Sequence, residues 1–152
     1  MDRENVMRKA LFWMKFSYIL MVVFAVLGGL GLILGVVMGT TRAAIPLLVS
    51  VINLAVQIVI ILGLFKGKKV LGEGGIPEEW PYILNIAFLG YSILLSILNM
   101  PQSMEAVPAE MQSAMTPWIL VGYGLTILQM IPPLAGWMKL RKLSKLGYEN
   151  GK

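Results

Sequence analysis

The sequence predicts an all-α membrane protein, a four-transmembrane-helix antiparallel bundle. Hydrophobic residues make up 57% of the chain and charged residues 14%, whereas a soluble domain contains about 25% charged residues. Four uncharged apolar stretches have about the 20 residues that a helix needs to cross a bilayer. The basic residues fall almost wholly into three segments outside these stretches. The apolar runs are continuous rather than alternating, which excludes the strands of a membrane β-barrel.

The predicted spans contain no Asp, Glu, Lys or Arg, and they cover about 16–38, 44–65, 81–100 and 118–138. Tryptophan side chains near the ends of the spans are typical of membrane interfaces. They are Trp13, Trp80, Trp118 and Trp137. A linker over 66–80 joins the second span to the third, and an outer loop over 101–117 joins the third to the fourth. The whole chain, 1–152, is therefore interpreted as one transmembrane domain.

Twelve of the thirteen basic residues lie in segments that such a bundle places on one side of the membrane. They are Arg3, Arg8, Lys9, Lys15, Lys66, Lys68, Lys69, Lys139, Arg141, Lys142, Lys145 and Lys152. Because basic segments stay in the cytoplasm, we expect a multi-pass protein of the cell membrane with cytoplasmic N- and C-termini. The same residues predict contact with anionic lipid headgroups. Nucleic-acid binding is not expected, because the basic residues are divided among three clusters at the membrane edge.

The two halves of the chain resemble one another, which indicates a duplicated two-helix hairpin. Tyr18-Ile19-Leu20 and Phe24 recur as Tyr82-Ile83-Leu84 and Phe88. Gly63 and the three lysines after it recur as Gly136 and the basic residues after it. Chance is the alternative, because apolar segments match easily and any cytoplasmic helix end attracts basic residues.

The first span carries a stripe of glycines that would let another helix approach closely. It consists of Gly28, Gly31, Gly35 and Gly39, and the last three form two consecutive GxxxG steps. Helices pack tightly against such stripes in membranes. Packing within the chain is the favoured interpretation, and a homodimer seam is the alternative.

Uncharged polar side chains lie near the middle of the last three spans. They are Asn53, Gln57, Tyr91, Ser92, Tyr123, Thr126 and Gln129. Because amides in hydrocarbon need partners, we expect these side chains to face the interior of the bundle. They form either hydrogen bonds between helices, which is the favoured interpretation, or a polar cavity that binds a neutral ligand or a lipid headgroup.

Two consecutive prolines, Pro132 and Pro133, interrupt the fourth span. Neither has an N–H group, so the carbonyls of Leu128 and Gln129 lose their helical partners. We expect a hinge at this point, next to the polar residues.

The outer loop is rich in methionine, with Met100, Met104, Met111 and Met115 at i, i+4 spacing in two pairs. Thioether sulfurs are soft ligands that select Cu(I) or Ag(I). A loop helix lying on the membrane surface explains these methionines equally simply, and it is the favoured interpretation.

Function follows from these features only in outline. The chain has no Cys and no His, which removes zinc fingers, thiol redox chemistry and nucleophiles paired with histidine. We therefore expect a non-enzymatic membrane protein without a cofactor, acting as a subunit, scaffold or assembly partner of itself or of another membrane protein. The alternative is a channel or carrier for an uncharged solute or lipid, which would use the polar midplane. Soft-metal handling by the outer methionines is a lesser alternative.

Overall fold

The computed structural model describes residues 3–38, 44–105, 117, 120–122 and 124–149, with the backbone alone described over 44–46, 99–105 and 147–149. All regular secondary structure in these residues is helical. The helices are α1 (Arg3–Val37), α2 (Ala44–Gly72), α3 (Trp80–Glu105) and α5 (Ile131–Glu149). Further helical residues, 124–129, precede α5.

Within the described residues, three helical segments are long and apolar enough to cross a membrane. They are Arg3–Val37, Leu47–Gly72 and Trp80–Leu98. The expectation of an all-α membrane protein is therefore confirmed at this level. The predicted fourth span, 118–138, is not among them: it includes residues outside the described part of the chain, and a turn at Met130 divides the rest. A bundle of four spans stays a prediction.

The helices extend beyond the apolar stretches. α1 begins 13 residues before the predicted span, and α2 continues through the basic residues to Gly72. Lys, Arg, Leu and Met are all good helix formers, so charge ends the membrane span without ending the helix. The connection between α2 and α3 is therefore residues 73–79, which is shorter than the linker predicted over 66–80.

Glycine ends α2. Gly74 has a positive φ of 83°, the Gly75 N–H donates to the Val70 carbonyl at 2.9 Å, and the Gly74 N–H donates to the Leu71 carbonyl at 3.2 Å. This pair of bonds is the Schellman motif, in which a glycine in the left-handed conformation satisfies the last carbonyls of a helix. The Gly72-Glu73-Gly74-Gly75 sequence is thus a helix stop.

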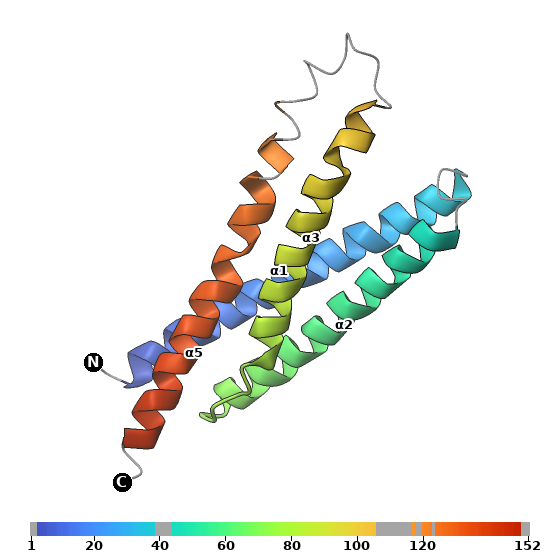
Figure 1. Ribbon diagram of the computed structural model, residues 1–152. Helices are drawn as coiled ribbons and strands as arrows, with labels where there is room; N and C mark the ends of the chain where they lie inside the picture. The colour runs from blue at the N-terminus through green and yellow to red at the C-terminus, as the bar shows by residue number, and fades with distance from the viewer. Residues whose placement is uncertain (1–2, 39–43, 106–116, 118–119, 123, 150–152) are drawn as a thin grey trace.

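The helices form a ring of four contacts, in which α1 packs against α2 and α5, and α3 packs against the same two helices. The start of α1, the end of α5 and the α2–α3 connection lie at one end of the molecule (Figure 1). Towards the other end, the α1–α2 pair diverges from α3 and the helical residues before α5. We call the end at which the helices stay together the closed end. The basic residues at the start of α1, in the last turns of α2 and in α5 are therefore gathered there.

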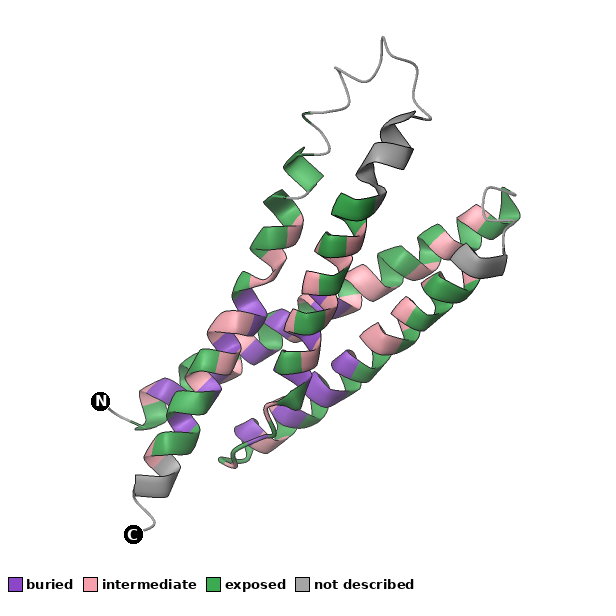
Figure 2. Cartoon of the chain, in the orientation of Figure 1, coloured by how far each residue is buried: buried purple, intermediate pink, exposed green. Residues whose placement is uncertain are grey.

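The core occupies this closed end (Figure 2). Its buried residues are Val6, Ala10, Met14, Met21, Ile60, Leu64, Leu71, Tyr82, Leu140 and Leu143. Along α1, α2 and α5 they recur at steps of three, four or seven residues, which keeps one face of each helix inward. A hydrogen bond closes the same end, because the Trp137 Nε1–H donates to Glu79 Oε2 at 2.8 Å and so joins α5 to the α2–α3 connection.

Two glycines in this closed end allow close packing. A Cβ on Gly63 would lie 2.5 Å from the Trp80 ring, and a Cβ on Gly136 would lie 2.5 Å from the Tyr82 ring. Gly63 and Gly136 are a matched pair in the proposed duplication, but both receive side chains from the start of α3. In a duplicated hairpin, α1 corresponds to α3 and α2 corresponds to α5, so Gly63 would contact α1 as Gly136 contacts α3. Since Gly63 contacts α3 instead, the duplication stays a hypothesis.

Candidate functional site

The inward face of each helix changes character halfway along the bundle. On α2 the buried positions Leu71, Leu64 and Ile60 are followed, at the same helical spacing, by Gln57 and Asn53. Such a face cannot form a dry apolar core, because each amide carries polar atoms that need partners.

On α3 the inward series begins with the fully buried Tyr82 and Asn85 and continues through Leu89 to Ser92. On α1 the series Ser17, Met21 and Phe24 leads to Gly28. Beyond the core, these inward faces present small or polar residues, which are Gly28 on α1, Gln57 and Asn53 on α2, and Ser92 on α3.

A cavity of about 380 Å³ lies at this level. Its lining comes from α1, α2, α3 and the helical residues before α5. The lining residues are Met21, Phe24, Leu27, Gly28, Asn53, Gln57, Phe88, Leu89, Ser92, Thr126 and Gln129. The volume and the mixture of apolar walls with a few polar groups are in the range of small-molecule sites, and the cavity is partly open rather than enclosed.

Several polar groups of the cavity offer hydrogen-bond acceptors. The Ser92 hydroxyl donates to the Phe88 carbonyl, and the Thr126 hydroxyl donates to the Gly122 carbonyl, each at 2.9 Å. With their protons engaged on their own helices, these oxygens can only accept further bonds. The Gln57 Oε1 atom is buried and has no hydrogen-bond partner among the described residues. The cavity therefore presents acceptors to a ligand with O–H or N–H groups, while the NH₂ groups of Asn53, Gln57 and Gln129 are hydrogen-bond donors.

A smaller hollow of about 10 Å³ continues the cavity towards the closed end. It shares Met21, Phe24, Leu89 and Gln129 with the cavity and adds Ser17 and Asn85 to the lining. The Ser17 Oγ and Asn85 Oδ1 atoms are buried and unpartnered within the described part of the chain. The volume of the hollow is about that of one water molecule.

The sequence predicted much of this lining. Five of the seven midplane residues proposed as ligand-binding line the one cavity: Asn53, Gln57, Ser92, Thr126 and Gln129. Tyr91 does not line it and is 46% exposed. Tyr123 lies outside the described residues. Ser17 and Asn85 were not on the list, although Asn85 shares the helical face of Ser92.

The helix is interrupted by a turn close to the predicted hinge. Met130 forms a turn in which its N–H donates to the Ile127 carbonyl at 3.0 Å, and α5 begins at Ile131. Pro133 is buried and lines the small hollow. Whether Pro132 and Pro133 act as a hinge stays a prediction.

At Gly28 and Gly31, no helix lies against the glycine stripe of α1. A Cβ added to Gly28 or Gly31 would meet no atom within 4 Å, and Gly28 faces the cavity. Among the glycines that the structure describes, the closest approaches by other side chains occur instead at Gly63 and Gly136. The packing role predicted for the stripe therefore stays a prediction, and Gly39 lies outside the described residues.

The metal-binding role predicted for the outer methionines stays a prediction. Met100 and Met104 lie one turn apart in the backbone of α3, while Met111 and Met115 lie outside the described residues.

No family model, curated protein or solved structure matches this chain.

Proposed function

We propose that this chain is a multi-pass membrane protein whose midplane cavity binds an uncharged molecule with hydrogen-bond donors, as a carrier for a neutral solute or lipid. One observation carries the proposal: five polar residues from three separate segments line a single cavity that is otherwise apolar. The walls suit a ligand with an apolar body, and the unpartnered Gln57 oxygen suits a hydroxyl or an amide N–H.

The membrane arrangement belongs to the same proposal. We infer a fourth span over about 118–138, and we infer cytoplasmic termini from the distribution of the basic residues. The cavity then lies near the middle of the bilayer, where a polar group crossing the membrane loses the most hydration. Acceptors at that depth lower the barrier to its passage.

Replacing Gln57 by Leu should weaken the binding of a hydroxyl-bearing probe by about fivefold, because one hydrogen bond contributes about 1 kcal/mol. The probe is a photoreactive long-chain alcohol in vesicles that contain the purified chain, and labelling is measured against concentration. The methyl ether of the same alcohol has no donor and should label the wild type as weakly as the alcohol labels Gln57→Leu.

Tyr91→Phe is the matched control, because this side chain is at a similar depth but outside the lining. It should leave labelling by the alcohol unchanged. Equal labelling of the wild type by the alcohol and the ether would contradict the proposal.

An assembly role is the second candidate function, and the open glycine face of α1 favours it. Two copies of α1, or α1 and a partner helix, could approach closely along Gly28 and Gly31.

Replacing Gly31 by Leu tests the assembly role, because the site is exposed and open in the single chain. Stability of the single chain should change by less than about 0.5 kcal/mol, as for other exposed positions. If the stripe is a seam, crosslinking between copies in vesicles should fall sharply. Unchanged crosslinking would leave the stripe without an assembly role.

A further inference from the structure

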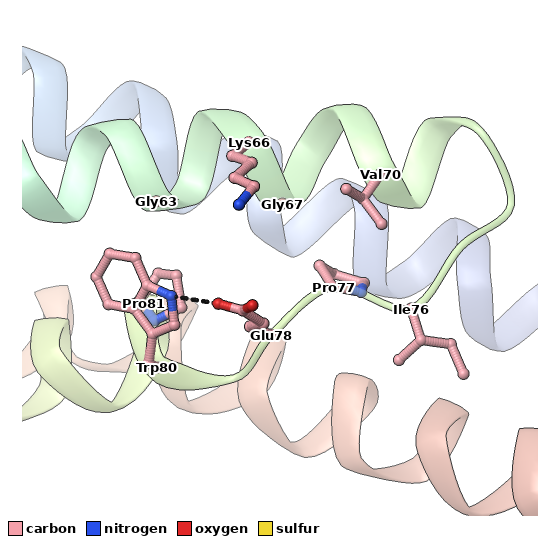
Figure 3. A pocket seen from close by; sticks show the side chains of 9 residues that line it. All are labelled: Gly63, Lys66, Gly67, Val70, Ile76, Pro77, Glu78, Trp80 and Pro81. Atoms are coloured by element: carbon pink, nitrogen blue, oxygen red, sulfur yellow. Dashed lines mark hydrogen bonds between the residues drawn. The ribbon is translucent and has the colours of Figure 1, made fainter.

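A second hollow, of about 180 Å³, lies where α2 leaves the apolar stretch (Figure 3). Its walls are the last turns of α2, the α2–α3 connection and the start of α3. The lining residues are Gly63, Lys66, Gly67, Val70, Ile76, Pro77, Glu78, Trp80 and Pro81. It shares no lining residue with the midplane cavity, so it is a separate site.

The hollow combines two opposite charges with apolar walls. Lys66 reaches into it from α2 and Glu78 from the connection (Figure 3). The Trp80 Nε1–H donates to Glu78 Oε2 at 2.8 Å, which holds the carboxylate at the hollow and leaves its other oxygen free to accept. In the described part of the chain, the Lys66 ammonium forms no hydrogen bond or ion pair, even with Glu78. A cation and an anion at separate places in one hollow match a ligand that carries both charges.

The position of the hollow matches the headgroup layer of a membrane. Lys66 is the first charged residue after the apolar stretch 44–65, and Trp80 is the kind of side chain that lies at the membrane interface. Basic pockets between membrane helices at this depth bind lipid headgroups. Gly63, Trp80 and Pro81 lie on the side of the hollow towards the apolar stretch, where the part of the lipid next to the headgroup would lie (Figure 3).

We propose that this hollow binds the phosphoethanolamine headgroup of a phospholipid in the adjacent leaflet. The phosphate lies against the Lys66 ammonium, and the primary ammonium of the lipid donates to the Glu78 carboxylate. Both are charge-assisted bonds, which are stronger than neutral ones. A choline headgroup has no N–H to donate, and a glycerol headgroup brings no positive charge to Glu78. The site therefore selects the primary amine.

Binding of three lipids that differ only in headgroup tests the proposal. The purified chain in detergent is mixed with phosphatidylethanolamine, phosphatidylcholine or phosphatidylglycerol of identical acyl chains, and bound lipid is counted by native mass spectrometry. The wild type should hold phosphatidylethanolamine about tenfold more tightly than phosphatidylcholine, which corresponds to one charge-assisted bond. Equal affinity for the two would overturn the proposal.

Two variants test which side chain binds the phosphate and which binds the ammonium of the headgroup. Lys66→Gln should lose affinity for all three phospholipids. Glu78→Gln keeps an oxygen for Trp80 and should bind phosphatidylethanolamine and phosphatidylcholine equally. Lys69→Gln and Glu73→Gln are matched controls, because both residues are exposed in the same region but outside the lining. If the controls reduce lipid binding as much as Lys66→Gln does, the effect is general charge and the proposal fails.

A competition experiment distinguishes a phospholipid ligand from a soluble molecule that carries the same headgroup. Glycerophosphoethanolamine has no acyl chains, so it should displace the phospholipid only weakly if the lipid itself is the ligand. Displacement at equal concentrations would assign the site to a soluble phosphoethanolamine compound and overturn the membrane source. The unfolding midpoint of each variant should equal that of the wild type, because Lys66 and Glu78 are both exposed.

Discussion

Replacing Leu64 by Ala should lower the free energy of unfolding by about 2–5 kcal/mol, the range measured for buried Leu-to-Ala changes. Leu64 is fully buried on α2, in the closed end of the bundle. The substitution leaves a cavity that neighbouring helices cannot fill without moving. Unfolding of the purified chain in mixed detergent measures the effect.

Leu62 is the matched control, because it lies on the same helix and is 61% exposed. Leu62→Ala should cost less than about 0.5 kcal/mol, as an exposed position does. Equal losses for the two variants would mean that α2 is rotated relative to this structure. The inward face, and with it the placement of Gln57 in the cavity, would then be wrong.

Replacing Gly136 by Ala should destabilise the chain by about 1–3 kcal/mol, the usual cost of overpacking. The new Cβ would lie 2.5 Å from the Tyr82 ring and hydroxyl, so α3 and α5 must move apart. This loss exceeds the gain of about 0.5–1 kcal/mol that alanine brings to a helix interior. The same detergent unfolding measurement applies.

A double-mutant cycle isolates the contact between the two helices. Leu at position 82 lacks the ring atoms that approach Gly136, so Gly136→Ala should cost clearly less in a Tyr82→Leu chain than in the wild type. Gly90→Ala on α3 is the control: its Cβ meets no atom within 4 Å, and it should be neutral or stabilising. If the cost of Gly136→Ala is the same in both backgrounds, Tyr82 is not its cause.

The sequence was most informative where a single physical effect dominates. Continuous apolar stretches predicted helices that can span a membrane, because hydrocarbon tolerates no unpaired backbone. The spacing of Asn53 and Gln57 placed both on one face of α2, and both line the cavity. Charge, in contrast, marked the ends of the apolar stretches but not the ends of the helices. The helix stop at Gly74 depends on backbone conformation rather than on polarity.

Other features depend on how the helices are rotated and paired, which composition does not determine. Tyr91 and Ser92 are adjacent, but successive side chains of an α-helix point about 100° apart around its axis. Of the two, only Ser92 lines the cavity. The GxxxG pattern drew attention to α1, whereas the closest approaches at described glycines are those to Gly63 and Gly136. A glycine is needed where a partner side chain arrives, and the partner lies far away in the sequence.

The lining of the midplane cavity has an electrical consequence. None of the described residues that line it is Asp, Glu, Lys, Arg, His, Cys or Tyr, so this described lining has no group that gains or loses a proton between about pH 5 and 8. The membrane potential acts on charge, at about 2.3 kcal/mol per elementary charge for each 100 mV, and it does no work on a neutral ligand in a neutral site. Occupancy of the cavity should therefore be the same in energised and de-energised vesicles, and the concentration gradient of the ligand alone should set the direction of its movement.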